Sequence, residues 1–395
     1  MSGIKSLVTS DIDINHLIAD YQNFFVPAFC IKVATSPNST PDQDILKLNP
    51  PVAIFSVSVD RVLDEAGSFS FTIDNPSYID KNGQKFPRLQ SDSLFQPQRD
   101  IIIEMGYGSA LKPVISGFIE SVDVSFAANG ISQLTIKGYD YLRKLMKEKK
   151  FISDGSRENK TTYSKVVRKI LDEYHMADGA DIEETIEEYS CVKNDKSNDF
   201  EFIKTVLAKE VGYEIYIRDK VFHFHRPRMQ EASVITGMVW GKSLISFSPS
   251  LDTSAQVTKV EVKGWDSLTQ EPIIGIAEAG SESNRGRGQS GSEAAEAAGN
   301  NAVEKIWREE LNTVGQVQQY AQAVLDKRSQ QLYTGSGECL GLPEIEPGIR
   351  IELLGLGDRF SKEYYITKVS HSISSSGFKT QFSVKENTLP AKGSI

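Results

Sequence analysis

The chain has 395 residues, enough for two or three domains of ordinary size. Apolar residues make up 39% of it and charged residues 25%, a composition that argues against wholesale disorder. The formal net charge of −9 argues against a protein that binds nucleic acid by neutralising phosphates or that adheres to an anionic membrane surface.

The cysteines and the N-terminus point to a reducing compartment. Cys30, Cys191 and Cys339 are far apart and lack any C-x-x-C spacing, so we predict free thiols and neither a disulfide framework nor a structural zinc site. The first 33 residues lack a basic region followed by an apolar stretch, and no run approaches 18 apolar residues. We therefore expect a soluble protein that is assembled in the cytoplasm without a signal peptide and is not inserted into a membrane.

The first 150 residues are typical of strands. Apolar and polar residues alternate through 52–62, 68–73, 100–105, 114–126 and 131–137. Period-two alternation of β-branched and aromatic residues indicates half-buried strands, and Asn129-Gly130 is a strong hairpin signal. We predict a first β-barrel domain over residues 1–150.

Residues 151–245 are mixed in pattern. Apolar residues recur at helical spacing through 163–174 and again through 199–210, and Gly212 stands where a C-terminal glycine ends a helix. Segments 213–217 and 221–224 then form a predicted hairpin. We interpret 151–245 as an α/β insertion domain.

The remaining residues return to strands. We predict that 246–277 contains strands joining a second barrel, that 278–301 is a flexible Gly/Ser-rich loop, and that 302–335 is a helix. Residues 336–395 then supply the final strands of a second β-barrel domain. The predicted fold class is mainly β (α+β), with two related β-barrels, a small α/β insertion and a long helix.

An internal repeat links the two predicted barrels. Segment 100–137 resembles segment 348–385, and the pairs Ile119/Ile366, Val122/Val369 and Gly130/Gly377 share one offset of 247 positions (366 − 119, 369 − 122, 377 − 130). Pairs such as Glu104/Glu352 and Lys137/Lys385 need one residue of slippage. The pattern indicates a repeated three-strand meander. A ring of three such chains presents six similar units, and so suits an adaptor between a sixfold and a threefold partner.

Four segments of the chain resemble the tail hub proteins of contractile phages and related injection systems. They are 199–213, which includes Asp-Phe-Glu-Phe ending at Phe202 and the turn at Gly212; 257–266, with Gly264 and Trp265; 342–357, with Pro347, Gly348 and Gly357; and 364–380, with His371 and Gly377. The order and spacing of these family-signature positions resemble the phage late control D family and the N-terminal hub part of the VgrG spike proteins.

The resemblance implies a mechanical role with no catalytic residues, metal or cofactor. In that family a homotrimer with two related barrels per chain forms a pseudo-sixfold ring. The ring joins the hexameric tail tube protein to the trimeric spike protein, contacts other baseplate proteins and encloses the central channel of a phage tail or phage-tail-like particle. VgrG proteins continue into an oligonucleotide-binding-like domain and a β-prism, whereas this chain ends at Ile395, so we expect the spike to be a separate protein.

Few residues suggest chemistry of their own. His223 and His225 alternate on one strand and so face the same side, but no nearby residue offers an obvious third metal ligand. The common hydrolase, nucleotide and metalloprotease motifs are absent from the sequence, and we predict a protein that is not an enzyme and has no nucleic-acid specificity.

Two alternatives remain open. The first is a β-sandwich carbohydrate- or receptor-binding tail protein with aromatic platforms, for which the candidates are Tyr107, Trp240, Trp265 and Trp307. The second is a hub-associated cell-wall hydrolase, for which the acidic run Asp181, Glu183, Glu184, Glu187 and Glu188 is the candidate; we interpret this run as a solvated acidic face.

Overall fold

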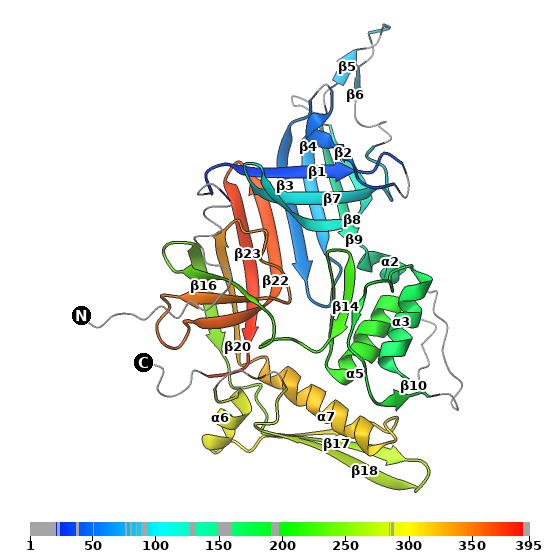
Figure 1. Ribbon diagram of the computed structural model, residues 1–395, viewed down its shortest axis with the longest axis vertical. Helices are drawn as coiled ribbons and strands as arrows, with labels where there is room; N and C mark the ends of the chain where they lie inside the picture. The colour runs from blue at the N-terminus through cyan, green and yellow to red at the C-terminus, as the bar shows by residue number, and fades with distance from the viewer. Residues whose placement is uncertain are drawn as a thin grey trace, which may run out of the picture.

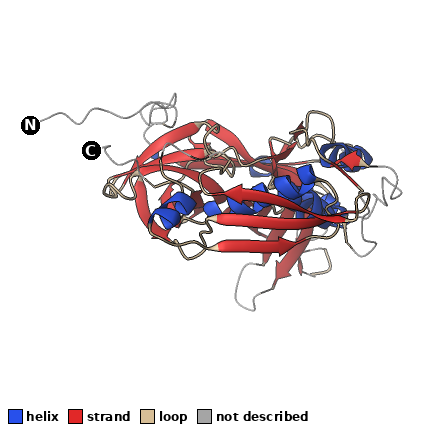
Figure 2. Cartoon of the chain, turned by 90° about the horizontal axis from the view of Figure 1, so that it is seen from below, coloured by secondary structure: helices blue, strands red, loops and turns tan. Residues whose placement is uncertain are grey.

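A computed structural model gives the architecture of the chain (Figure 1). It describes residues 21–389 except 22–23, 37–38, 50, 76, 80, 84, 88–93, 127–131, 148–159, 191–196, 284 and 286–287. Strands dominate the molecule (Figure 2), as the predicted fold class requires. Gly130 of the repeat and Cys191 lie outside the described residues.

Thirteen strands form one large sheet. The first half contributes β1 (Pro27–Val33), β2 (Gln43–Asp44), β3 (Ile54–Val62), β4 (Ser68–Asp74), β7 (Asp100–Tyr107), β8 (Ala110–Ser125) and β9 (Gln133–Asp140). The second half contributes β15 (Val234–Val239), β16 (Leu244–Leu251), β20 (Tyr333–Leu340), β21 (Arg350–Leu354), β22 (Lys362–Ser374) and β23 (Gly377–Glu386). The main path runs β16-β20-β23-β22-β3-β4-β9-β8-β7-β1-β2, and β21 joins β15 to β22.

The repeated meander is present in the strand pairing. β7-β8-β9 and β21-β22-β23 are both antiparallel. β8 shifts register between Ile119 and Ser121, and β22 shifts between Ile366 and Lys368. The two irregularities are again 247 positions apart (366 − 119), so the same bulge bends the central strand of both copies.

The ends of the two copies also match, although the flanking pair Lys137/Lys385 does not. Asp140 ends β9 and accepts a hydrogen bond from the backbone N–H two residues on, and Glu386 does the same at the end of β23. Lys137 pairs with Ser121, however, whereas Lys385 pairs with Tyr365 on the other side of the bulge. The expected Lys137/Lys385 equivalence is therefore wrong, because register in a sheet is set by pairing across strands and not by sequence likeness.

The two halves are joined directly by hydrogen bonds. β22 pairs with β3 in antiparallel fashion from Lys368↔Val62 to Ile373↔Val57, and the two strands lie side by side in Figure 1. One hydrophobic core includes buried residues of both halves, such as Val57 and Phe71 from the first and Val369 and Phe382 from the second.

Smaller elements surround this sheet. The hairpin β5 (Ser77–Ile79) and β6 (Lys85–Pro87) extends from the first half, where the short helix η2 (Ile45–Lys47) also lies. Residues 142–225, called the insertion below although it was expected over 151–245, contain the next elements. They are α2 (Leu142–Lys147), β10 (Thr161–Thr162), α3 (Tyr163–Glu173), β11 (Asp181–Ile182), β12 (Glu188–Tyr189), α4 (Asp199–Phe202), η4 (Ile203–Ala208), α5 (Lys209–Val211), β13 (Glu214–Arg218) and β14 (Val221–His225). A further layer contains β17 (Lys259–Asp266), β18 (Glu271–Glu278), α6 (Gly291–Ala297), β19 (Val303–Trp307) and α7 (Val314–Ser329).

Two expectations for residues 278–335 are wrong in part. Residues 302–335 are not one helix, because Val303–Trp307 forms β19 in parallel register with β17, and α7 begins only after its N-cap, Thr313. The predicted loop 278–301 contains α6, whose first turn is held by a capping box between Ser290 and Glu293. The Ser-x-x-Glu spacing that marks this box was present in the sequence, although the surrounding glycines and serines obscured it.

α7 ties the further layer to the insertion. It packs on β17 and β18, and its buried residues Val317 and Leu325 share a second hydrophobic core with Ile170 and Phe224 of the insertion. Gly212 ends the helical run 199–211 with a φ of +72°, and a Cβ there would lie 3.1 Å from the Ala323 side chain of α7. The predicted helix stop is confirmed, and it coincides with a close approach of two helices.

Candidate functional site

A buried charged junction lies where the two halves of the sheet meet the insertion. The Glu346 carboxylate, in the loop between β20 and β21, is 3.1 Å from Arg61 on β3 and 3.0 Å from Arg218 on β13. The Arg61 guanidinium also donates to the carbonyl of Ile217 at 2.7 Å and to that of Val114 at 3.3 Å. One carboxylate thus holds two cations from parts of the chain that are far apart in sequence.

A second buried cluster lies beside this junction. The Tyr365 hydroxyl of β22 donates to Glu214 of β13, and the Lys385 ammonium lies 3.9 Å from the same carboxylate. Burial raises the pKa of Glu214 to about 7, although Lys385 and Tyr365 act to lower it, and burial also lowers the pKa of Lys385. Asp64, after β3, accepts from the Ile215 backbone at 2.9 Å. These contacts attach the insertion to both halves of the sheet.

Three of the family-signature positions lie at this junction. Pro347 accepts a hydrogen bond from Arg218 through its carbonyl at 2.5 Å. Gly348 has a φ of +85°, and a Cβ there would lie 3.0 Å from the hydroxyl of Tyr216. His371 is buried, with Nδ1 2.9 Å from the Thr380 hydroxyl and Nε2 3.1 Å from the Ile345 carbonyl.

The other signature positions are scattered. Phe202 is buried in the second core with Gly212 ending its helical run, and a Cβ on Gly264 would lie 2.3 Å from the Leu311 carbonyl. The neighbouring Trp265 is half-buried. Gly357 and Gly377 have φ values of +75° and +98° with open space around them, as turns require. The structure thus gives each position a local packing or backbone role.

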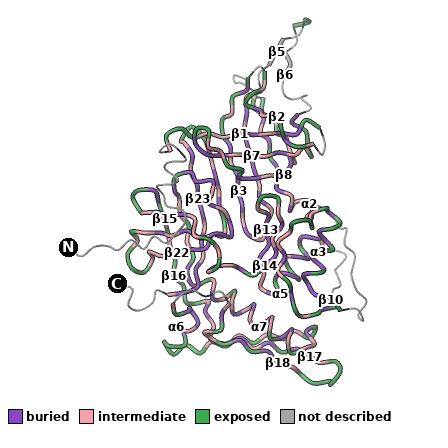
Figure 3. The backbone as a smooth tube through the Cα atoms, in the orientation of Figure 1, coloured by how far each residue is buried: buried purple, intermediate pink, exposed green. Residues whose placement is uncertain are grey.

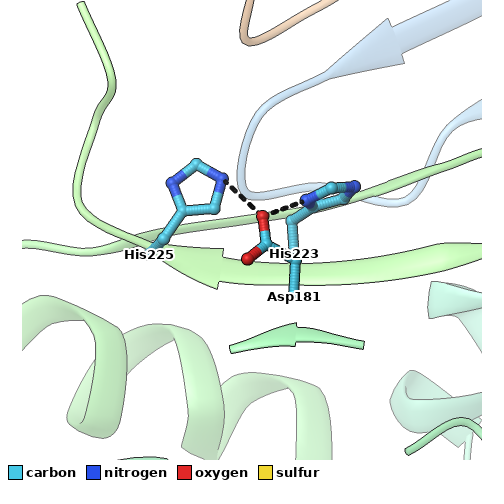
Figure 4. A group of neighbouring side chains, drawn as sticks. All are labelled: Asp181, His223 and His225. Carbon is cyan, nitrogen blue, oxygen red and sulfur yellow. Dashed lines mark hydrogen bonds and ion pairs between the residues drawn. The ribbon is translucent and has the colours of Figure 1, made fainter. Parts of the chain in front are cut away.

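A further polar group, Asp181, His223 and His225, lies at the edge of the insertion sheet (Figure 4). β11 pairs with β14 in parallel, with Asp181 opposite His223. The Asp181 Oδ2 atom is 3.1 Å from His223 Nδ1 and 4.0 Å from His225 Nε2. Sequence reasoning found the two histidines on one face but missed the third residue, because Asp181 comes from another strand 42 positions away.

Burial and hydrogen bonds shift the pKa values of all three residues in this group. Burial lowers the pKa of His223 to about 4 and lowers that of His225, so both rings are neutral at pH 7. Burial acts to raise the pKa of Asp181, but hydrogen bonds from Arg228 and His223 outweigh it and hold that pKa low. Arg228 binds both carboxylate oxygens, at 2.8 and 3.2 Å.

The residues proposed for the two alternative functions do not come together in one site. Tyr107 is 3% exposed and packs against Tyr21, Phe24 and Phe378, so it is wrong as an exposed platform. Trp240 and Trp307 are exposed but belong to different sheets. In the acidic run, Glu183 pairs with Arg226 and Glu184 with Arg168. Both carboxylates are therefore engaged in separate ion pairs.

Exposed apolar side chains gather on the small sheet β18-β17-β19. Its inner face, with Val260, Val262 and Ala277, is buried in the second core. The outer face carries Ile274 (49% exposed), Ile276 (39%), Val303 (44%) and Trp307 (56%). Register places Ile274 and Trp307 on either side of Lys263. Along these strands exposed positions alternate with buried or intermediate ones (Figure 3). Such a face is typical of a protein–protein contact surface.

None of the helices in the described part of the chain is long and apolar enough to cross a bilayer.

Solved structures with the same fold come from phage tails and a related secretion machine. The tail protein from Neisseria meningitidis MC58 matches with a TM-score of 0.63 and 11% identity, over 92% of this chain and 97% of its own. The 43 kDa tail protein of prophage MuSo2 from Shewanella oneidensis matches with a TM-score of 0.61 and 12% identity, over 91% and 98%.

A third similar structure is the E. coli c3393 protein, described as a component of the type VI secretion system with structural similarity to the T4 tail proteins gp27 and gp5. It matches with a TM-score of 0.54 and 14% identity, over 91% of this chain and 79% of its own. These likenesses establish the fold.

No curated protein matches the chain in sequence. A family model does match, and it covers most of the fold, from η2 in the first half of the sheet to the end of β22 in the second. On this match over residues 46–375, the chain belongs to the Alg8 N-terminal domain family.

Proposed function

We propose that the chain is the structural hub of a contractile injection system or phage baseplate, working by docking and not by catalysis. The fold shared with tail proteins of two organisms supports a place in a tail. The likeness to the type VI component supports a place in the spike-bearing part of such a machine.

The observation that carries the proposal is the repeated bulged meander within one sheet. β8 and β22 bend at matching positions, and β22 pairs directly with β3 of the other half. Each chain therefore presents two similar units in a fixed relation. Three chains around an axis give six such units, the symmetry needed to join a hexameric tail tube to a trimeric spike around a channel.

The buried junction supports the same role. Glu346 with its two arginines, and Glu214 with Tyr365 and Lys385, connect three parts of the chain through side chains that are largely out of solvent. A part that transmits force between a tube and a spike has to resist shear between its units. Other baseplate proteins are the remaining expected partners.

The first test is the absolute mass of the purified full chain by light scattering after size exclusion. We expect a particle of about 131 kDa, three times the 43.8 kDa chain. A stable dimer or tetramer would contradict the ring of three. If the chain alone is a monomer, the same run is made with the spike protein encoded beside it, and failure to form a complex with three copies would also contradict the proposal.

A further inference from the structure

From the geometry of Figure 4 we infer that Asp181, His223 and His225 form a binding site for a divalent transition-metal ion of the zinc class, at which the ion replaces Arg228 on the carboxylate. This inference is independent of the hub proposal.

The backbone brings the three ligand atoms together. His223 and His225 are alternate residues of β14, so their rings lie on one face, and parallel pairing places Asp181 opposite His223. The three ligand atoms all lie within 4.8 Å of one another. A tetrahedral zinc ion with bonds of about 2.0–2.1 Å holds its ligand atoms a little over 3 Å apart. The two separations from Asp181 Oδ2 are 3.1 and 4.0 Å, and the one between the two histidine nitrogens is within 4.8 Å, so rotation of the side chains has to draw the three atoms closer together to match that spacing.

His225 is already oriented as a ligand. Its Nδ1 lies 2.7 Å from the Arg226 carbonyl, and a ring nitrogen facing a carbonyl at that distance has to carry the hydrogen. Nε2 therefore carries the lone pair; it lies 3.2 Å from the Tyr216 hydroxyl, its present donor, and 4.0 Å from Asp181 Oδ2. A ring hydrogen bond to a backbone carbonyl is the usual support of a metal-binding histidine.

His223 needs one change of tautomer. Its Nδ1 now faces Asp181 Oδ2 and carries the hydrogen, while the ring stacks on Tyr216 with centroids 4.5 Å apart. Ligation through Nδ1 moves that hydrogen to Nε2 by exchange with water. The ring stays neutral before and after, so no net proton is released at this residue.

Arg228 is the competing cation. It holds both oxygens of Asp181, and its side chain is 37% exposed, so it can turn towards solvent when an ion takes Oδ2. Two imidazoles and one carboxylate favour Zn²⁺, Co²⁺ or Ni²⁺ over Ca²⁺ and Mg²⁺, which prefer all-oxygen sites. A water molecule completes the coordination.

Binding at this site has a structural consequence. Tyr216 contacts both histidines and also lies against Gly348 of the signature segment. An ion that fixes the two rings therefore fixes the strand pair β11–β14 next to the charged junction. We assign the site a stabilising role.

The test uses the full chain, stripped of metal with a chelator and titrated with CoCl₂ and then ZnCl₂. We expect one Co²⁺ per chain with the visible absorption of a four- or five-coordinate nitrogen and oxygen site, displaced by Zn²⁺. His223→Gln and Asp181→Asn should each weaken binding at least about tenfold, because each removes a ligand. Arg228→Gln should tighten it by more than about tenfold, because a unit charge is removed a few Å from a divalent ion.

The control is His175→Gln, which changes an exposed histidine away from the cluster and should leave binding unchanged. If neither the natural chain nor Arg228→Gln binds cobalt, the site is only an ion pair and the inference fails. It also fails if the His223→Gln variant binds cobalt as tightly as the natural chain does. Circular dichroism of each variant shows whether a loss of binding comes from loss of fold.

Discussion

Among single residues, burial shifts the pKa values of several ionisable side chains away from their ordinary values. His371 is neutral because burial lowers its pKa to about 3, with the Arg61 charge acting in the same direction. Asp140 and Glu214 are held protonated over more of the pH range, because burial raises the pKa of each to about 7. Because of His371 the free energy of unfolding falls as the pH is lowered, whereas because of Asp140 and Glu214 it falls as the pH is raised.

The contribution of His371 can be isolated by substitution. Its folded pKa of about 3 lies below the unfolded value of 6.5, so the unfolded chain binds a proton first and stability is lost as pH falls below 6.5. The free energy of unfolding of the natural chain should fall between pH 7 and pH 4. We expect this fall to be smaller by roughly 3 kcal/mol in His371→Gln, a variant that keeps a hydrogen-bond donor and an acceptor. Urea unfolding at both pH values measures it. The exposed His175→Gln serves as control, and an unchanged slope in His371→Gln would contradict the assignment.

At the scale of elements, the small sheet β18-β17-β19 differs from the large one. Its outer edge at β18 is covered, because Gln318 of α7 accepts from the Ile276 N–H at 3.0 Å and donates to the Ile276 carbonyl at 2.6 Å. Its outer face is not covered, and Trp307 and Ile274 are each about half exposed there. The β18 edge is thus occupied at Ile276, while the outer face mixes exposed apolar side chains with charged ones such as Glu261 and Lys263.

If this face contacts a neighbouring copy in the proposed ring, one substitution there changes the assembly. We expect Trp307→Ser to lower the mass measured by light scattering from that of a trimer towards that of a monomer, because a large exposed aromatic is a usual anchor of protein contacts. Leu268→Ser is the matched control, since Leu268 is 93% exposed in the turn between β17 and β18. An unchanged mass in Trp307→Ser would remove this face from the proposed trimer contact.

At the scale of the whole molecule, one continuous sheet and one charged junction join the parts. The Arg61 and Glu346 side chains are only 10% and 14% exposed, so the junction is desolvated and its partners depend on each other. The β22–β3 pairing adds backbone hydrogen bonds across the same boundary. The molecule is expected to unfold as one unit.

Removing the central carboxylate tests this coupling. We expect Glu346→Gln to destabilise the chain by about 3 kcal/mol, because the buried Arg61 and the partly buried Arg218 lose their counter-charge. Asp123→Asn, which breaks an exposed pair with Lys137, should leave the unfolding midpoint unchanged. Urea titration followed by circular dichroism measures both. Equal midpoints for the two variants would show that the junction does not hold the parts together.

Most of the local elements and the repeat could be predicted from the order of the residues alone. Alternation of apolar residues predicted most strands of the large sheet, Gly212 predicted the end of a helical run, and Ile119/Ile366 predicted matching positions that prove to flank the same bulge. These features follow from periodicity and backbone conformation, which depend on residues near one another in the chain.

The way in which distant segments meet could not be predicted from the sequence and became visible in the folded chain. Val303–Trp307 is a strand because β17 offers it a parallel partner more than 35 residues earlier, and local pattern alone had favoured a helix. Asp181 joins His223 and His225 only through the β11–β14 pairing, and Tyr107 is buried because rings from both halves of the sheet enclose it. Partner choice between strands and packing across a core are set by the free energy of long-range burial and pairing, which no single stretch of sequence contains.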